Sequence, residues 1–166
     1  FEVTNTGSGG VAIDDVLTYD GPCPNTEEVC DFESADVCGY EVGAWKVNTA
    51  LYFYTTTGVE ADVTTGTEQG HYIHVDATPQ TNASLVSPIY KPTSGRCLKF
   101  YYRVYGNIKD TFALLVSLRQ EGGNEYLIDR FLPPEDPSEW SFGEVNVVSG
   151  RYFQIVFDSN HLTGNI

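Results

Sequence analysis

The sequence contains no methionine, few basic residues and no long apolar run. No stretch approaches the roughly 20 consecutive apolar residues that a membrane-spanning helix needs, and no basic-then-apolar leader opens the chain. Lys and Arg number 9 against 23 Asp and Glu, which gives a net charge of −14. Because such a surface repels polyanions, it disfavours nucleic acid and anionic lipid as partners and suits cations or basic partners. We therefore expect neither nucleic-acid binding nor membrane insertion.

The cysteine content indicates the compartment. Four cysteines in a chain with no methionine and few lysines suit an oxidising, extracellular setting better than the cytosol, where thiols are kept reduced. Asn82 begins an Asn-x-Ser acceptor with an allowed middle residue, and it lies among turn-forming residues. We expect a secreted or extracellular glycoprotein that carries its glycan on Asn82.

Apolar and polar side chains alternate along most of the chain, whereas the spacing of an amphipathic helix is almost absent. Runs of Ala, Leu, Glu and Lys, which favour helices, are missing as well. Turn clusters such as "TSGR", "QEGGNE" and "PPEDPSE" separate the alternating runs. The sequence therefore predicts an all-β protein, an antiparallel β-sandwich whose two sheets pack their apolar faces together. The predicted inward stripes are Val11, Ile13 and Leu17; Leu98, Phe100, Tyr102 and Val104; Phe112, Leu114, Val116 and Leu118; and Phe153, Ile155 and Phe157.

The two ends of the chain are similar to each other. Residues 1–11, "FEVTNTGSGGV", and residues 157–166, "FDSNHLTGNI", both begin with Phe and an acid and pass through polar turn residues to Gly. This similarity indicates a repeat boundary. On this interpretation residues 1–24 are a terminal strand segment that completes a neighbouring module, 25–29 are a linker, and 30–166 are a sandwich that lacks its own last strand. A copy can fill the gap in the next copy, which predicts head-to-tail assembly into a fibre or stalk.

A family pattern is present in six segments: "CDFESADVCGY", "GHYIHVDA", "ASLVSP", "CLKFYYRVYG", "WSFGEVNV" and "FQIVF". In this order they resemble the MAM domain, an extracellular module named after meprin, a neuropilin antigen and receptor tyrosine phosphatase mu. The family's terminal "AIDDV" strand and "GPC" are supplied here by residues 12–23, and Tyr40 stands where the family usually has Trp. The resemblance implies a jelly-roll-like β-sandwich that acts in adhesion and assembly and is not catalytic.

The same resemblance implies how the cysteines pair. One bridge joins Cys30 to Cys38, and a second joins Cys97 to the cysteine of the terminal "GPC", which is Cys23 here. Because Cys23 falls in the segment assigned to a neighbouring module, we expect the second bridge to link copies. The alternative is a circularly permuted domain, in which residues 11–19 fold back into their own sandwich and the second bridge is internal.

Asp14 and Asp15 lie on a predicted strand, where they point to opposite faces, and they suggest a calcium site. Asp15 shares the alternation phase of Ile13 and Leu17, so its carboxylate is expected on the buried face. A buried carboxylate costs free energy unless a partner compensates its charge. A calcium ion compensates well because it gathers several oxygen ligands at once. The alternative is that these acids are solvated or cap turns. A likeness to related jelly-roll modules implies Glu33, Asp62 and Asp15 as ligands of a structural Ca²⁺, with Asp14 and Asp36 as further candidates.

Catalytic patterns are weak in this sequence. His71 and His74 are three residues apart, so on a strand they face opposite ways and do not share a metal. His-Glu-x-x-His and Gly-x-Ser-x-Gly patterns do not occur. The sequence therefore predicts a non-enzymatic extracellular structural or adhesive protein whose partners are copies of itself. The alternative is a receptor-like or lectin-like module that binds a glycan or a cell-surface protein.

Overall fold

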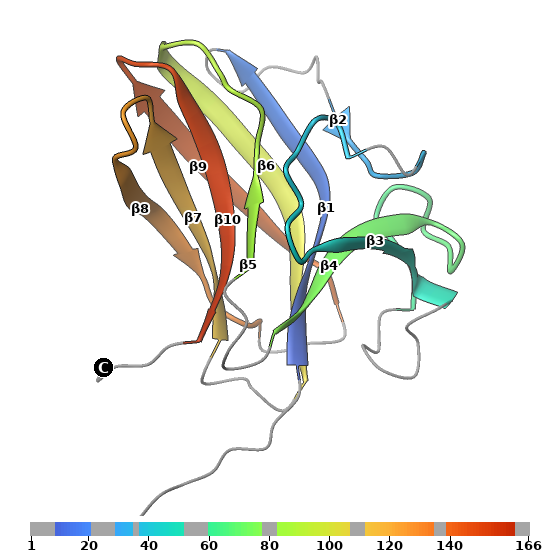
Figure 1. Ribbon diagram of the computed structural model, residues 1–166. Helices are drawn as coiled ribbons and strands as arrows, with labels where there is room; N and C mark the ends of the chain where they lie inside the picture. The colour runs from blue at the N-terminus through green and yellow to red at the C-terminus, as the bar shows by residue number, and fades with distance from the viewer. Residues whose placement is uncertain are drawn as a thin grey trace, which may run out of the picture.

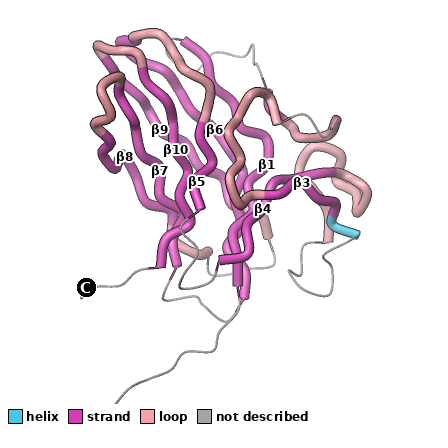
Figure 2. Tube along the Cα trace, in the orientation of Figure 1, coloured by secondary structure: helices cyan, strands magenta, loops and turns pink. Residues whose placement is uncertain are grey.

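The computed structural model describes residues 9–20, 29–34, 37–51, 60–77, 83–106, 112–134 and 139–161. Two antiparallel sheets lie face to face, as Figure 1 shows. In the part of the chain described, helical backbone is limited to residues 50–51, the short cyan segment of Figure 2. Nothing helical in these ranges has the length and apolar character needed to cross a membrane. The predicted all-β antiparallel sandwich is confirmed.

Within the described ranges, the first sheet has six strands and the second has four. In the first sheet the order is β3-β4-β1-β6-β9, and β2 pairs with β1 beside this path. The order in the second sheet is β5-β10-β7-β8. The first sheet consists of β1 (Gly9–Asp20), β2 (Val29–Cys30), β3 (Lys46–Thr49), β4 (His71–Ala77), β6 (Thr93–Gly106) and β9 (Ser141–Ser149). The second consists of β5 (Ala83–Val86), β7 (Phe112–Gln120), β8 (Glu125–Phe131) and β10 (Phe153–His161).

The core lies between the sheets and is formed by the alternating stripes. Phe100 of β6 is its centre, because its ring meets Phe131 and Phe157 edge to face with centroids 5.0 and 5.1 Å away. Each such side chain contributes about 1.5–3 kcal/mol by leaving water. The predicted stripes of β6 and β10 are buried as expected, and so are Leu114, Val116 and Leu118 of β7. Phe32 and Trp45 are also buried there, although no strand alternation marks them.

Strand β1 lies in the middle of its own chain's sheet, between β4 and β6. Val11 is opposite both Val75 and Val104, and Ile13 belongs to the same core as Phe100 and Ile155. The expectation that residues 1–24 complete a neighbouring module concerns a second copy of the chain and stays a prediction; within one chain, residues 30–166 form the sandwich together with β1. In this structure the final strand of the sandwich is supplied by the start of the same chain. The strand that follows β1 in the chain, β2, pairs with it directly: Val16 and Leu17 lie opposite Cys30 and Val29 in antiparallel register.

A bulge in β1 changes which side chains face the core. The register with β6 shifts between Asp14 and Leu17, and Asp15 has a φ of 48°. After this shift Val16 enters the main core. The expectation that Leu17 shares the face of Val11 and Ile13 is therefore wrong, since an extra residue in a strand reverses its alternation.

The disulfide from Cys30 to Cys38 is confirmed, with Cα atoms 6.0 Å apart. It ties the end of β2 to the turn before Tyr40. Cys97 is disulfide-bonded as well, and the register places it opposite Tyr19. Cys23 lies outside the described residues. The expected bridge between Cys23 and Cys97 therefore stays a prediction, with its internal and inter-copy alternatives both open.

Candidate functional site

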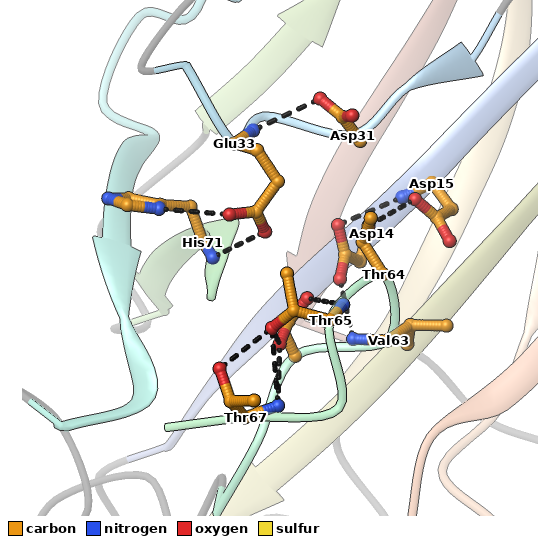
Figure 3. Close-up of polar contacts among 10 residues, drawn as sticks. Asp14, Asp15, Asp31, Glu33, Val63, Thr64, Thr65, Thr67 and His71 are labelled. Atoms are coloured by element: carbon orange, nitrogen blue, oxygen red, sulfur yellow. Dashed lines mark hydrogen bonds and ion pairs between the residues drawn. The ribbon is translucent and has the colours of Figure 1, made fainter. Parts of the chain in front are cut away.

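Acids from separate parts of the chain gather where β1 bulges, and we call them the acidic cluster. Figure 3 shows Asp14 and Asp15 on β1, Asp31 and Glu33 after β2, and the threonine-rich loop that carries Asp62. The bulge brings both aspartates of β1 toward that loop. Of the predicted calcium ligands, the structure thus brings together Asp14, Asp15, Glu33 and Asp62, and Asp36 lies outside the described residues.

Asp14 is the most buried member of the acidic cluster, with no exposed surface. Its carboxylate accepts hydrogen bonds from the backbone N–H of Val63 (2.9 Å) and of Asp15 (3.0 Å). Burial raises the pKa of Asp14 to about 8, and the negative charges of Asp15 and Asp62 act in the same direction. The sequence placed Asp15 on the core face, but after the bulge Val16 takes that place, and Asp14 is buried beside the loop at Val63.

Asp15 is partly buried beside the same loop. Its carboxylate accepts a hydrogen bond of 2.6 Å from the Thr64 hydroxyl. Burial raises the pKa of Asp15, and the charges of Asp31, Asp62 and Glu33 raise it further against the opposing hydrogen bond. The neighbouring carboxylates are thus close enough to repel one another.

Asp62 is buried at the centre of the loop and organises it. Burial raises its pKa, but this effect is outweighed by hydrogen bonds from Thr65 and Thr67, so that the pKa of Asp62 is lowered. The Thr65 hydroxyl and N–H donate at 2.5 and 2.6 Å, and the Thr67 N–H donates at 3.1 Å. Gly70 allows this approach, because a Cβ there would lie 2.0 Å from the Asp62 carboxylate oxygen.

Glu33 connects the cluster to β4. Its Oε1 accepts a hydrogen bond from the His71 N–H at 2.7 Å, and its Oε2 lies 3.3 Å from His71 Nδ1. Asp31 accepts a hydrogen bond from the Glu33 N–H at 3.1 Å, which fixes the turn after Cys30. His71 and Asp31 were not identified from the sequence as parts of the site. The segment "CDFES" contained a signal for Asp31, because an Asp side chain often accepts a hydrogen bond from the backbone N–H two residues later and so forms an Asx turn.

The acidic cluster fits a hard cation in its donor chemistry, because all of its ligand atoms are carboxylate oxygens. In the present arrangement those oxygens are held by N–H and hydroxyl donors of the loop and of β4. No three acids, histidines or cysteines in the described ranges stand together as a ready metal site. A bound ion would therefore have to draw the carboxylates away from some of these donors.

The two histidines on β4 do not act together. His71 faces Glu33, whereas His74 is fully buried, with its Nε2 2.9 Å from the Asn48 amide. Burial lowers the pKa of His74, so it remains neutral more readily than a free imidazole. The two side chains thus have different partners. Asn82, the predicted glycan acceptor, lies outside the described residues.

Comparison with known proteins gives a consistent family. The family model of the MAM domain (meprin/A5/mu) matches residues 30–165. MAM domain-containing glycosylphosphatidylinositol anchor protein 1 of Gallus gallus is 29% identical over 178 residues, covering 94% of this chain and 18% of that protein. Thyroid hormone-induced protein B of Xenopus laevis is 30% identical, covering 89% and 22%, and MAM domain-containing protein 2 of Mus musculus is 27% identical, covering 78% and 20%. The chain spans about a fifth of the length of these curated relatives.

Proposed function

The chain belongs to the MAM domain family, and on this basis we propose that it is a non-catalytic adhesion module of a longer extracellular protein. The observation that carries the proposal is the family match over residues 30–165, combined with the β-sandwich that these residues form with β1. The relative from Gallus gallus is named for a glycosylphosphatidylinositol anchor, which is an attachment to the cell surface. The cysteine content and the Cys30–Cys38 bridge support the same oxidising environment.

Self-association of the module is tested directly with beads. Fluorescent beads coated with the 166-residue chain cluster if the module adheres to copies of itself. Beads coated with an unrelated β-sandwich of similar charge stay dispersed, because a surface with a net charge of −14 alone repels its own kind. Dispersed beads at every density of coating, with and without calcium, contradict an adhesive role between copies.

Assembly through strand donation is the finer part of the proposal. Strand β1 fills the space between β4 and β6, and removing it exposes two sheet edges and an apolar groove. In a longer protein with several such units, residues equivalent to 9–20 can fill this space in the unit that precedes them. The similarity of residues 1–11 to residues 157–166 supports this arrangement, because it places the strand where one unit passes into the next. The same contacts that close the chain here then hold a head-to-tail array together.

A structural calcium ion is the other part of the proposal. Asp14 and Asp15 both have raised pKa values, because they are buried near other carboxylates. A divalent cation relieves this repulsion, and Glu33 and Asp62 complete an all-oxygen set. We expect the ion to fasten β1 to the segment after β2 and to the threonine-rich loop. Its role is stability, since none of these residues belongs to a catalytic arrangement.

A further inference from the structure

A pocket of about 490 Å³ lies at one end of the sandwich, and no residue of the acidic cluster lines it. Its walls come from three connections: Ile89 between β5 and β6, Gln120–Gly123 at the β7–β8 turn, and Tyr152–Gln154 at the start of β10. These connections meet at the upper end of the sandwich in Figure 1. We call it the loop-end pocket.

The loop-end pocket is preformed, because hydrogen bonds between backbones join its walls. The Glu121 N–H donates to the Tyr152 carbonyl at 2.8 Å, which joins the β7–β8 turn to β10. Tyr90 and Phe153 exchange two such bonds, of 2.7 and 3.1 Å, which join the β5–β6 connection to the same strand. A ligand therefore meets walls that need little ordering, and ordering is one of the main costs of binding.

Two large side chains form the exposed apolar part of the loop-end pocket. The side chain of Tyr152 is 48% exposed and that of Ile89 is 70% exposed, although both are large. Gly122 and Gly123 have φ values of 99° and 85°, and this part of the β7–β8 turn lines the pocket without side chains. A tyrosine in this position offers a flat apolar face and a hydroxyl that forms hydrogen bonds.

The polar part consists of amides with fixed orientations. The Gln120 amide donates to the Ser149 hydroxyl at 3.1 Å, and the Gln154 amide donates to the Ser87 carbonyl at 2.9 Å. Since each amide nitrogen is held in this way, the carbonyl oxygens are held as acceptors. Arg119 uses its Nε–H on Glu125 at 2.8 Å, and its terminal N–H groups are further donors in the lining.

This combination selects a class of ligand. A pyranose has one face of C–H groups, which suits Tyr152, and a rim of hydroxyls, which suits fixed amides and a guanidinium. Arg119 and Glu121 give the lining one charge of each sign, and the net charge of −14 disfavours anions. We propose that the loop-end pocket binds a neutral saccharide. The proposal rests on the extracellular adhesive role above, because it names a partner class for that role.

The test uses the 166-residue chain labelled with ¹⁵N and a panel of neutral sugars: glucose, galactose, mannose, N-acetylglucosamine and lactose. A bound sugar shifts the backbone resonances of Tyr152, Gln154 and the β7–β8 turn. Tyr152→Ala weakens binding roughly tenfold, because an aromatic contact worth about 1.4 kcal/mol is lost. Tyr126→Ala is the matched control, since Tyr126 on β8 is 46% exposed and is absent from the lining. It leaves the affinity unchanged.

Several results overturn the proposal. These are no shift with any sugar of the panel, shifts that Tyr152→Ala does not weaken, or shifts with a sulfated disaccharide but none with neutral sugars. Resonance shifts of the pocket residues with peptides, but with no sugar of the panel, also overturn it. The bead experiment separates this failure from that of the proposed function. If the beads cluster but the chain binds no sugar, the adhesive role between copies stands and the saccharide proposal fails. If the beads stay dispersed but the chain binds a sugar, the saccharide site stands and adhesion between copies fails.

Discussion

Asp14 shows how a single carboxylate ties the site to the stability of the fold. Its pKa is raised from 3.8 to about 8, chiefly by burial and then by the charges of Asp15 and Asp62. A carboxyl group with a raised folded-state pKa stabilises the fold fully below pH 3.8, and this contribution is lost as the pH rises toward 8. The lowered pKa of Asp62 acts in the opposite direction, and only below its ordinary value of 3.8.

In calcium-free buffer we therefore expect the free energy of unfolding to receive a falling contribution from Asp14 between pH 4 and 8. Asp14→Asn removes the ionisation while it keeps the shape, so the variant gains stability relative to the wild type as the pH rises. Urea unfolding at several pH values measures the difference. Asp129→Asn, at an exposed position on β8, is the control and keeps the wild-type profile. If the free energies of unfolding of Asp14→Asn and the wild type change with pH in parallel, the raised pKa of a buried Asp14 is contradicted.

Gly143 on β9 faces the centre of the core. A Cβ at this position would lie 2.5 Å from the Phe100 ring, so Gly143→Ala must displace the aromatic cluster. We expect a loss of roughly 1–3 kcal/mol in the free energy of unfolding, measured with urea. Gly150→Ala is the matched control, because nothing lies within 4 Å of a Cβ there. Equal midpoints for the two variants contradict the close packing of β9 on Phe100.

At the scale of elements, alternation predicted where the strands run but not which strands pair. The stripes of β6, β7 and β10 follow directly from side chains with a period of two. The position of β1 does not follow, since a central strand of this kind fits its own sandwich or that of a neighbour equally well by local pattern. The bulge at Asp15 is also invisible to alternation, and it places Val16 instead of Asp15 in the main core.

The candidate site was predictable where short segments resembled a family pattern. That resemblance identified Glu33, Asp62 and Asp15 as neighbours, and they are. Thr64, Thr65 and Thr67 did not enter the predicted site, although they donate hydrogen bonds to Asp15 and Asp62. The run "ADVTTGT" has the short polar side chains that bond to nearby backbone, which is the signal that alternation overlooks.

Strand β1 contributes to the core as fully as the strands in the middle of the chain. Ile13 has no exposed surface and packs with residues of both sheets. Ile13→Ala is expected to lower the free energy of unfolding by about 2–5 kcal/mol, because it removes a buried side chain and leaves a cavity. Val148→Ala on β9, where the side chain is 57% exposed, is expected to change it by less than about 0.5 kcal/mol. A small effect of Ile13→Ala in urea unfolding contradicts the central position of β1.

At the scale of the whole molecule, calcium is expected to raise the melting temperature. At a free concentration about 100 times the dissociation constant, an ion that binds only the folded chain raises the midpoint by roughly 5–10 °C. Differential scanning calorimetry in calcium chloride, magnesium chloride and a chelator measures this. Asp62→Asn reduces the shift, and Asp129→Asn leaves it intact. Equal midpoints in calcium and chelator for the wild type exclude a structural calcium ion.

The space between β4 and β6 is the feature on which closure and assembly both depend. Val11 and Val104 are opposite each other across β1 and β6 and face the same core. A tagged Val11→Cys chain refolded with an untagged Val104→Cys chain therefore reports whether β1 of one copy enters another. Val148→Cys in place of Val104→Cys is the control, because Val148 is exposed on β9.

The most direct measurement is mass spectrometry of the disulfide-linked peptides from this mixture, at increasing protein concentration. Strand donation predicts a covalent pair between the tagged and untagged chains through positions 11 and 104, increasing with concentration and missing from the Val148→Cys control. If the double variant Val11→Cys and Val104→Cys links only within itself, and the mixture gives no covalent pair at any concentration, β1 does not pass between copies and head-to-tail assembly through this strand is contradicted.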